Sequence, residues 1–317
     1  MTNKERYREL CKREATIPIF SKSWWLDSVA GKNWDVVLVE KKGEIQAALP
    51  FTVRQKFGLK IIGQPMLTQT LGPWLRSSSA KYAKQLSREK SLLQELFNKL
   101  PEYARYCQSW HHNRTNWLPL YWKGYEQNTR YTYRIEELEN IDMLWANFQE
   151  NIRREIRKAA DKEGITVRDD VDLESFLALN EKVFERQNME VPYTRDLVRS
   201  LDKAAASNHA RKIFVAEDEQ GRQHAGLYLI WDDNSAYYLM GGGDPLLRSS
   251  GATSLCMWEA IKFAATVTKS FDFEGSMLEP VERFFRSFGA IQTPYFQVSK
   301  TKSKLVKSYL FLKDMKS

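Results

Sequence analysis

The sequence is poor in the residues that build metal sites and disulfide frameworks. Its 317 residues include three cysteines and four histidines, and no CxxC pair occurs. Three widely separated cysteines predict reduced thiols rather than a disulfide framework. His111 and His112 are adjacent, so on a regular element their side chains diverge and cannot share one ion. We therefore expect no metal site.

Long apolar runs are also missing. No run approaches the roughly 18 residues that a membrane-spanning helix needs, and the mean hydropathy is -0.53. Residues 1–18 are charged throughout and lack the apolar core of a secretory signal. We expect a soluble, cytoplasmic protein without a membrane span. Its oligomeric state is left open by the sequence.

The charge is unevenly distributed along the chain. The formal net charge is +8, and residues 1–140 hold 23 Lys and Arg against 14 Asp and Glu, whereas residues 141–317 hold 25 against 26. The segment 300–317 is again basic, with six lysines against a single aspartate. This pattern favours an anionic partner, such as a nucleotide-linked substrate or RNA. A net charge of this size also suits general solubility.

The order of elements predicts two domains with one plan. In each half, strands lead into a glycine-rich loop, a helix and further strands, and the composition turns acidic near residue 140. A helix placed between two strands implies a parallel pair, so each sheet should be mixed, mostly antiparallel and flanked by helices. The prediction is an α+β fold with domains at 1–140 and 141–299. Residues 117–122 and 270–277 are predicted as strands, residues 141–164 and 252–267 as helical, and residues 212–232 as a hairpin with its turn at DEQGR.

The loop at 243–252 is the strongest candidate site. The strand AYYLM ends in three glycines, and a loop of small residues with one arginine then leads into a helix. Unpaired amides at a helix start favour an anion, small residues let a phosphate approach, and the arginine adds a charge. An ordinary capped helix after a glycine loop is the alternative. The predicted donor-binding residues are Gly243, Arg248, Ser249, Ser250, Gly251 and Ala252.

The segment SFDFEGSM (270–277) supplies a second candidate. On a strand, Asp272 and Glu274 would face away from Phe271 and Phe273. Two carboxylates on one side of a central strand are costly unless that side opens on a solvated channel. One of them could then accept the proton that an attacking amine must lose. The alternative is a pair of structural ion pairs with nearby arginines.

Several motifs carry a resemblance to a known family. RSSGAT (248–253) resembles the Q/R-x-x-G-x-G/A phosphate loop of GNAT acyltransferases, with Thr253 where Gly or Ala is usual. NIRREIRKA (151–159), FDFEGSM (271–277), VERFFRSFGA (281–290) and WLPLYWKGYEQNTRYTY (117–133) resemble segments of FemABX-type acyltransferases, the methicillin-resistance type. The resemblance runs from residue 19 to residue 300.

The resemblance implies two tandem GNAT-like domains, with residues 300–317 returning to pack on the first. Family members transfer an aminoacyl group from tRNA to an amine on a UDP-linked or lipid-linked peptidoglycan precursor. The resemblance implies contacts between the precursor's phosphates and residues of this chain, whereas a solvated basic face is the alternative for the helix at 151–159. The predicted acceptor-binding residues are Lys32, Arg153, Arg157, Arg186 and Tyr193.

A second position, besides Thr253, departs from the family pattern. Many members carry F-K-x-x-F-G near the C-terminus, where the lysine helps the charge that develops in the reaction. In this chain the lysine position holds Phe285. Arg286 and Lys300 are the candidates to replace it, and Arg286 joins the two carboxylates as a predicted catalytic residue.

The sequence thus predicts a FemABX-like acyltransferase that works in peptidoglycan biosynthesis by direct transfer. No Ser-His-Asp or Cys-His arrangement is visible, so a covalent intermediate has no evident nucleophile. The acyl donor, aminoacyl-tRNA or acyl-CoA, would be a co-substrate, with no tightly bound cofactor. The alternatives are a coenzyme-A-dependent GNAT N-acetyltransferase and a nucleic-acid-binding protein without catalysis.

Overall fold

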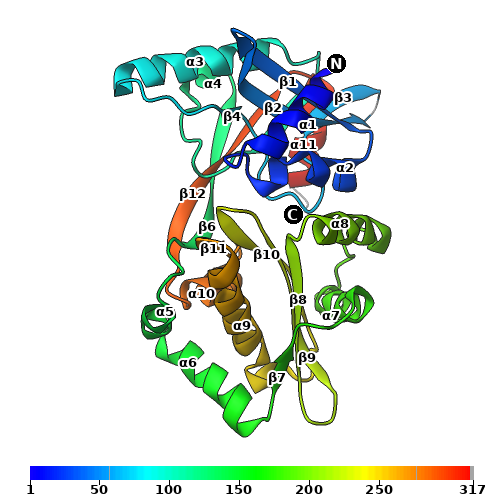
Figure 1. Cartoon of the computed structure of the whole chain (residues 1–317). Coiled ribbons are helices and arrows are strands. Elements are labelled where there is room, and N and C mark those ends of the chain that lie inside the picture. Colours follow the sequence, from blue (N-terminus) through cyan, green and yellow to red (C-terminus); the bar gives the residue numbers. More distant parts are fainter. Residues whose placement is uncertain (57, 276, 315–317) are drawn as a thin grey trace. The chain divides into compact units, whose positions relative to one another are not determined.

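Two units of the chain each carry a sheet flanked by helices (Figure 1). The computed structural model describes residues 1–56, 58–275 and 277–314. The first unit comprises residues 1–130 and the chain from Pro294 onward, and the second comprises residues 131–293. The limits 1–140 with 300–317, and 141–299, stay predictions for the domain boundaries. Among the described helices, none is long and apolar enough to cross a membrane.

The first unit is built on a mixed sheet in which β1, β2, β3, β5 and β12 are neighbours in that order, and β4 pairs with β2. Its strands are β1 (Trp34–Lys41), β2 (Glu44–Lys56), β3 (Leu59–Gly63), β4 (Trp74–Leu75), β5 (Arg105–Ser109) and β12 (Ile291–Thr301). Its helices are α1 (Asn3–Arg13), α2 (Ser23–Ala30), α3 (Tyr82–Asn98), α4 (Leu118–Tyr121) and α11 (Lys304–Asp314). β6 (Glu126–Ile135) runs from this unit into the second.

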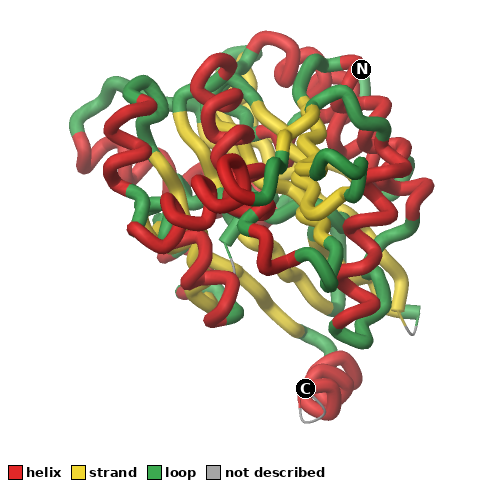
Figure 2. The backbone as a smooth tube through the Cα atoms, turned by 90° about the horizontal axis from the view of Figure 1, so that it is seen from below, coloured by secondary structure: helices red, strands yellow, loops and turns green. Residues whose placement is uncertain are grey.

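Local sequence explains the main pairings of the first unit. β1 and β2 form an antiparallel hairpin whose turn residues, Lys42 and Gly43, both have positive φ, as a tight hairpin turn requires. β3 and β5 are parallel, because α3 lies between them in the chain. β12 pairs antiparallel with β5, and α11 follows it directly at the end marked C in Figure 2.

The second unit is a mixed sheet with strand order β6, β11, β10, β9, β8, β7. Its further strands are β7 (Thr166–Arg168), β8 (Arg211–Glu217), β9 (Gln223–Trp231), β10 (Ser235–Gly243) and β11 (Ser270–Asp272). Its helices are α5 (Ile141–Asn147), α6 (Glu150–Arg157), η2 (Lys158–Lys162), α7 (Leu173–Arg186), α8 (Arg195–Ser207), η3 (Arg248–Ser250), α9 (Ala252–Val267) and α10 (Glu279–Arg286). The expected parallel pair is β10 with β11, on either side of α9.

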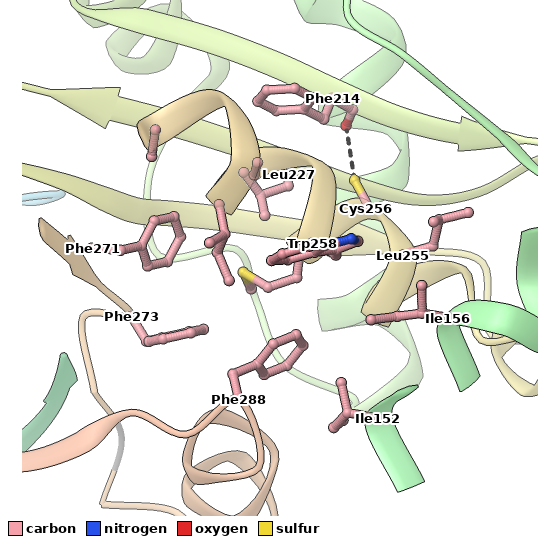
Figure 3. Packing of buried hydrophobic residues seen from close by; sticks show 14 of the residues in the cluster. Ile152, Ile156, Phe214, Leu227, Leu255, Cys256, Trp258, Phe271, Phe273 and Phe288 are labelled. Carbon is pink, nitrogen blue, oxygen red and sulfur yellow. Dashed lines mark hydrogen bonds between the residues drawn. The ribbon is translucent and has the colours of Figure 1, made fainter. Parts of the chain in front are cut away.

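Helices cover both faces of this second sheet. α9 packs on β8 and β9, whereas α7 packs on β9 and β10, and Figure 1 shows α9 on one side of these strands with α7 and α8 on the other. Figure 3 shows the core beneath α9, where Trp258, Phe271, Phe273 and Phe288 lie together with apolar residues of α6. Within this core the Cys256 thiol donates to the Phe214 carbonyl oxygen. The core therefore holds α9 firmly against the sheet.

Two predicted elements are wrong, and the strand predicted over 270–277 ends at Asp272. WLPLYW (117–122) is not a strand: Leu118–Tyr121 form a helical turn with Pro119 in its first turn, a position at which proline's missing N–H costs nothing. The helix expected over 141–164 is broken between α5 and α6, because Phe148 takes an extended backbone conformation and its ring enters the core.

Candidate active site

β10 separates from β11 at the centre of the second unit. The two strands pair in parallel only from Ser235 to Tyr237 of β10, and the pairing of β10 with β9 is then shifted between Tyr238 and Met240. Such a bulge bends a strand and redirects its side chains. Beyond the bulge, β10 ends in three glycines. The splayed pair leaves a place where a ligand can reach the backbone.

The glycines allow close packing around this opening. A Cβ atom on Gly242 would lie 2.8 Å from the backbone nitrogen of Asn180 and 2.9 Å from the carbonyl carbon of Leu179, so α7 lies directly against β10. A Cβ atom on Gly241 would collide with the hydroxyl of Tyr238. The Tyr238 ring therefore lies over the backbone of β10.

A pocket of about 550 Å³ opens at this point. Its lining residues come from α7, the segment after α7, β9, β10, the loop before α9, the first turn of α9 and α10. Its lining combines apolar and aromatic residues with polar side chains from α7, the segment after α7, β9 and the loop before α9. The lining residues are Asn180, Val183, Phe184, Arg186, Tyr193, His224, Tyr238–Asp244, Arg248, Thr253, Pro280, Val281, Phe284 and Phe285.

Hydrogen bonds fix the wall of the pocket between α7 and β10. The Tyr193 hydroxyl donates to Oδ1 of Asn180 at 2.9 Å, and Nδ2 of Asn180 donates to the Gly241 carbonyl at 2.6 Å. Burial raises the pKa of Tyr193 to about 12, so the phenol stays protonated. Tyr193 thus lines the pocket, held through Asn180.

Two arginines give the pocket its charge. Arg186 and Arg248 both line it and are exposed. Within the described residues, neither guanidinium has a hydrogen bond or an ion pair with the protein. The carboxylate of Asp244 in the same pocket is paired with Lys182 at 2.6 Å. The pocket therefore carries two cations that are available to an anionic ligand.

The predicted donor loop is divided between the pocket and the core. Gly243 and Arg248 line the pocket, whereas Ser250, Gly251 and Ala252 are buried beneath it. Gly251 has φ +83°, and a Cβ atom there would collide with the Glu155 carbonyl oxygen of α6. The N-cap residue of α9, Gly251, has no side chain, and Oγ of Ser250 lies 3.4 Å from the backbone nitrogen of Ala252. The amides that follow Ala252 in the first turn are left for a ligand or water.

Two residues of the loop lie elsewhere than the set of predicted donor-binding residues implies: Thr253 lines the pocket and Ser249 does not. Thr253, which the family pattern replaces by Gly or Ala, lines the pocket. Ser249 is exposed but lies outside the lining, and its carbonyl accepts a hydrogen bond from Nζ of Lys158 at 2.7 Å. This hydrogen bond connects the loop to η2.

A Ser-His-Asp arrangement is present, contrary to the expectation from sequence. Nδ1 of His224 lies 2.9 Å from Oγ of Ser250, and Nε2 lies 3.1 Å from Oδ2 of Asp218. All three residues are buried, and His224 also lines the pocket. Asp218 and Ser250 lie far apart in the chain, so no motif connects them and only the fold brings them together.

The two predicted catalytic carboxylates lie together but outside the pocket lining described here. Asp272 accepts from the Thr132 hydroxyl, and its Oδ2 lies 3.6 Å from Nε of Arg134. Burial raises the pKa of Asp272 to about 6. Burial first, and the nearby Asp272 second, raise the pKa of Glu274 well above its ordinary value. The backbone N–H of Glu274 donates to Oδ1 of Asp272 at 2.8 Å.

The expected strand alternation stops before Glu274. β11 ends at Asp272, and both Glu274 and Gly275 have positive φ, so the carboxylates are not successive members of one strand face. Gly275 is required by packing, because a Cβ atom there would collide with backbone atoms of Tyr131 and Thr132. The glycine therefore admits the neighbouring β6 backbone, and a ligand is not needed to explain it.

Arg286 and the two predicted arginines of α6 are engaged in ion pairs at the surface. Arg286 pairs with Glu282 at 2.8 Å on α10. Arg153 and Arg157 both pair with Glu150, at 2.8 and 2.7 Å. None of the three lines the pocket described above.

The predicted residues of the first unit lie in other surroundings. Lys32 lines a cavity of about 980 Å³ within that unit, together with Asp35 and Arg54. Nζ of Lys300 donates to the Lys123 carbonyl. Among the described residues, no group of His, Cys, Asp and Glu side chains is arranged to hold a metal ion.

Comparisons with known proteins agree with this architecture. Residues 146–284, which include the pocket except for a single residue on α10, match the sequence model of an acetyltransferase (GNAT) domain. Curated protein sequences provide no match.

Solved structures extend the similarity beyond this domain. A crystal structure of FemX is similar at 14% identity, with a TM-score of 0.67, over 93% of this chain and 96% of that one. L-PGS from Bacillus licheniformis is similar at 11% identity (TM-score 0.56; 98% and 94% covered). A tandem GNAT protein from the clavulanic acid biosynthesis pathway is similar at 8% identity (TM-score 0.53; 95% of each chain).

The predicted α+β fold of tandem GNAT type is confirmed by these similarities. At such low identities the structural likeness concerns the fold, and the acetyltransferase domain match supports the prediction of an acyltransferase. The chain therefore has a fold similar to that of FemX over nearly its whole length, and its residues 146–284 match the sequence model of an acetyltransferase (GNAT) domain.

Proposed function

We propose that this protein transfers an acyl or aminoacyl group from an anionic carrier to an amine, as FemABX-type enzymes do, and that the acceptor is a peptidoglycan precursor. The observation that carries the proposal is the second-unit pocket, in which Arg186 and Arg248 have no carboxylate partner among the described residues. Two free cations beside an uncapped helix start are suited to a phosphate-bearing substrate.

The loop end of the pocket would hold the donor. Arg248 and Thr253 border it, and the N-cap residue of α9, Gly251, provides no side-chain cap. The donor would be a co-substrate, either aminoacyl-tRNA or acyl-CoA, rather than a tightly bound cofactor. Arg186 and Tyr193, at the α7 end, would contact the acceptor.

The chemistry would proceed by direct attack of the amine on the acyl carbonyl. Holding the two substrates in one pocket removes most of the entropic cost of their meeting. The bulge in β10 lies between Tyr238 and Met240, which line the pocket, and backbone amides there could polarise the carbonyl. As the amine attacks, the C–N bond forms, the carbonyl oxygen gains charge, and the carrier then leaves as the C–O or C–S bond breaks.

Tyr238 would donate a hydrogen bond to the developing charge. Its ring packs edge-on against Phe285, the position at which the family has lysine, with centroids 5.8 Å apart. Burial, above all, raises the pKa of the Tyr238 phenol, so it keeps its proton at neutral pH. A protonated phenol is suited to stabilising an oxyanion without carrying a charge itself.

The proton of the attacking amine needs an acceptor. Asp272 and Glu274 remain the candidates, acting through water, because burial raises both pKa values and makes these carboxylates better bases. Arg286 lies at the surface of α10, where it forms an ion pair with Glu282. Its proposed catalytic role would therefore require this ion pair to break.

A coenzyme-A-dependent N-acetyltransferase is the second candidate function. The observation that favours it is the acetyltransferase domain match over the residues that form the pocket. In that case the pyrophosphate of the carrier would lie on the loop at 248–253. Thr253, in place of the usual small residue, narrows the space for it.

Calorimetric binding of three compounds in parallel separates these functions. Acetyl-CoA, a charged tRNA and a UDP-linked muropeptide are titrated into the wild-type protein and into Arg186→Ala and Arg248→Ala. Arg283→Ala is the matched control, because Arg283 is an exposed arginine of α10 that pairs only weakly with exposed Glu279. The main proposal expects charged tRNA and muropeptide to bind and Arg248→Ala to weaken the donor alone.

Other outcomes select other functions. Binding of acetyl-CoA without muropeptide would favour the N-acetyltransferase. Equal binding of charged and uncharged tRNA, unaffected by both pocket variants, would favour a nucleic-acid-binding protein. Loss of donor affinity in Arg283→Ala to the same extent as in Arg248→Ala would contradict the pocket assignment.

A further inference from the structure

We propose that Asp218, His224 and Ser250 form a positioning relay that holds the loop at 248–253 in the conformation that presents Arg248 and Thr253 to the pocket. Its role in donor binding rests on the proposed function, whereas its role in holding the loop does not. The three side chains are buried and joined in series by hydrogen bonds of 3.1 and 2.9 Å.

The Asp218 end of the relay is anchored in a tight turn. Asp218 begins the turn between β8 and β9, and its Oδ1 accepts from the backbone N–H groups of Gln220 and Arg222. Its Oδ2 accepts from the Arg222 guanidinium at 2.7 Å and from His224. Burial opposes ionisation of Asp218, but these hydrogen bonds hold its pKa below the ordinary value. The relay thus starts from a fixed carboxylate.

The ionised carboxylate determines the direction of the hydrogen bonds. A carboxylate only accepts, so Nε2 of His224 must donate to Asp218. In the neutral ring Nδ1 then has a lone pair, and the Ser250 hydroxyl donates to it. Because the Ser250 hydroxyl proton is donated to the His224 ring, Oγ of Ser250 can accept from the backbone N–H of Ala252, whose nitrogen is 3.4 Å away. The relay therefore orders the loop as far as the start of α9.

The loop is held from two sides. On the α6 side, Nζ of Lys158 donates to the Ser249 carbonyl, and the Ser254 hydroxyl donates to Glu155 at 2.6 Å. On the opposite side, the relay is the side-chain link between Ser250 and the β8–β9 turn. Gly251, between these attachments, has φ +83°. Loss of the relay would free one side of η3 and let Arg248 leave the pocket rim.

Burial favours positioning over nucleophilic catalysis for Ser250. Its residue exposure is 6%, and it is not among the residues that line the described pocket. Its hydroxyl is directed to the His224 ring and toward the Ala252 amide. A nucleophile would need to reach the acyl carbonyl, which this placement does not allow.

Two substitutions of His224 test the relay directly. His224→Leu removes both hydrogen bonds. His224→Gln restores a donor and an acceptor on one rigid amide, in the order that Asp218 and Ser250 require. Ser250→Ala removes the last link. Ser207→Ala is the matched control, because its hydroxyl is hydrogen-bonded within α8 only.

Hydrogen exchange measures how firmly the loop is held in the protein without any ligand. In His224→Leu and Ser250→Ala we expect the amides of 248–256 to exchange at least tenfold faster, with α7 unchanged. We expect His224→Gln to stay within threefold of wild type, as should the control. Equal exchange in all variants, or equal acceleration in His224→Leu and His224→Gln, would overturn the relay.

Binding then connects the relay to the donor. With inorganic pyrophosphate, acetyl-CoA and charged tRNA as probes, we expect each probe that binds wild type to bind about tenfold more weakly in His224→Leu and Ser250→Ala, with rescue in His224→Gln and unchanged muropeptide binding. If wild type binds none of the three probes but exchange behaves as expected, the donor proposal fails while the relay stands. An acyl ester found on Ser250 by mass spectrometry would overturn the positioning role.

Discussion

The buried Asp272 makes a testable prediction about stability and pH. Its ordinary pKa is 3.8, and burial raises the folded-state value to about 6, although Thr132 and Arg134 act in the opposite direction. The folded chain therefore binds more protons than the unfolded chain between these two values. Stability follows the difference in bound protons, so the Asp272 contribution falls as pH rises through this window.

The size of the stability change follows from the difference between the folded and unfolded pKa values of Asp272. A difference of about two pH units corresponds to about 3 kcal/mol, fully developed above about pH 7 and absent below about pH 4. In Asp272→Asn the titration is removed, whereas the fixed cost of losing the contacts to Arg134 is the same at every pH. Hence the free energy of unfolding of the variant, relative to wild type, should rise by about 3 kcal/mol from about pH 4 to about pH 8.

Urea unfolding at about pH 4, 6 and 8 measures this difference. Hydrogen exchange of α9 identifies the transition of the second unit, since the two units need not unfold together. Asp244→Asn is a control of opposite sign. Hydrogen bonding to Lys182 lowers the pKa of Asp244, so that variant should lose stability relative to wild type as pH rises.

One result would refute the reasoning. If Asp272→Asn loses stability relative to wild type as pH rises, Asp272 is ionised at low pH and acts chiefly as the anion of a pair with Arg134. Removing Asp272 also lowers the pKa of Glu274, since Asp272 contributes to raising it. This coupling adds to the expected rise, so it cannot produce the opposite sign.

Three further substitutions test the proposed site. Arg248→Ala should weaken an anionic donor by about 1.5–3 kcal/mol, the range for a hydrogen bond to a charged group, and unchanged affinity by calorimetry would remove Arg248 from the site. Tyr238→Phe should lower kcat roughly 100-fold, as expected for loss of an oxyanion donor, with an unchanged melting temperature; steady-state kinetics with kcat unaltered would count against it. For Glu274→Gln, a roughly 100-fold lower turnover at unchanged melting temperature would support the proposed base, whereas wild-type turnover would leave Glu274 a structural role.

Much of the fold could be predicted because its signals are local. The helix over 252–267 and the hairpin over 212–232 follow from periodicity and turn residues, and they match α9 and the β8–β9 pair closely. The parallel pairing of β10 with β11 follows from chain order alone. These features depend on residues that are neighbours in the sequence.

The failures share a different cause. The run at 117–122 has the composition of a strand, but it forms a helical turn whose Leu120 enters the first unit's core. The alternation at 270–274 is that of a strand, but the chain turns after Asp272 because its backbone must pass β6 at Gly275. In both cases contacts with distant residues overrule the local pattern.

The same distinction explains which parts of the site were predictable. An anion site at a helix start can be predicted from a glycine, small residues and one arginine in a short loop, and the structure places Arg248 in the lining of the pocket. The pocket wall needs Asn180 and Tyr193 to meet the end of β10, which no short motif encodes.

A buried histidine has no local signature at all, and His224 shows what this implies for prediction. Its neighbours in sequence belong to an ordinary hairpin, and its partners Asp218 and Ser250 meet it only because β9 runs beside the loop that precedes α9. The loop's sequence could indicate which atoms would meet an anion. Whether those atoms are held in place depends on a carboxylate and an imidazole contributed by another element. Anion recognition in this fold is therefore a local property of the loop, whereas its rigidity is a property of the hairpin. A substitution of Asp218, which does not line the pocket, should therefore alter donor binding without direct contact with the donor.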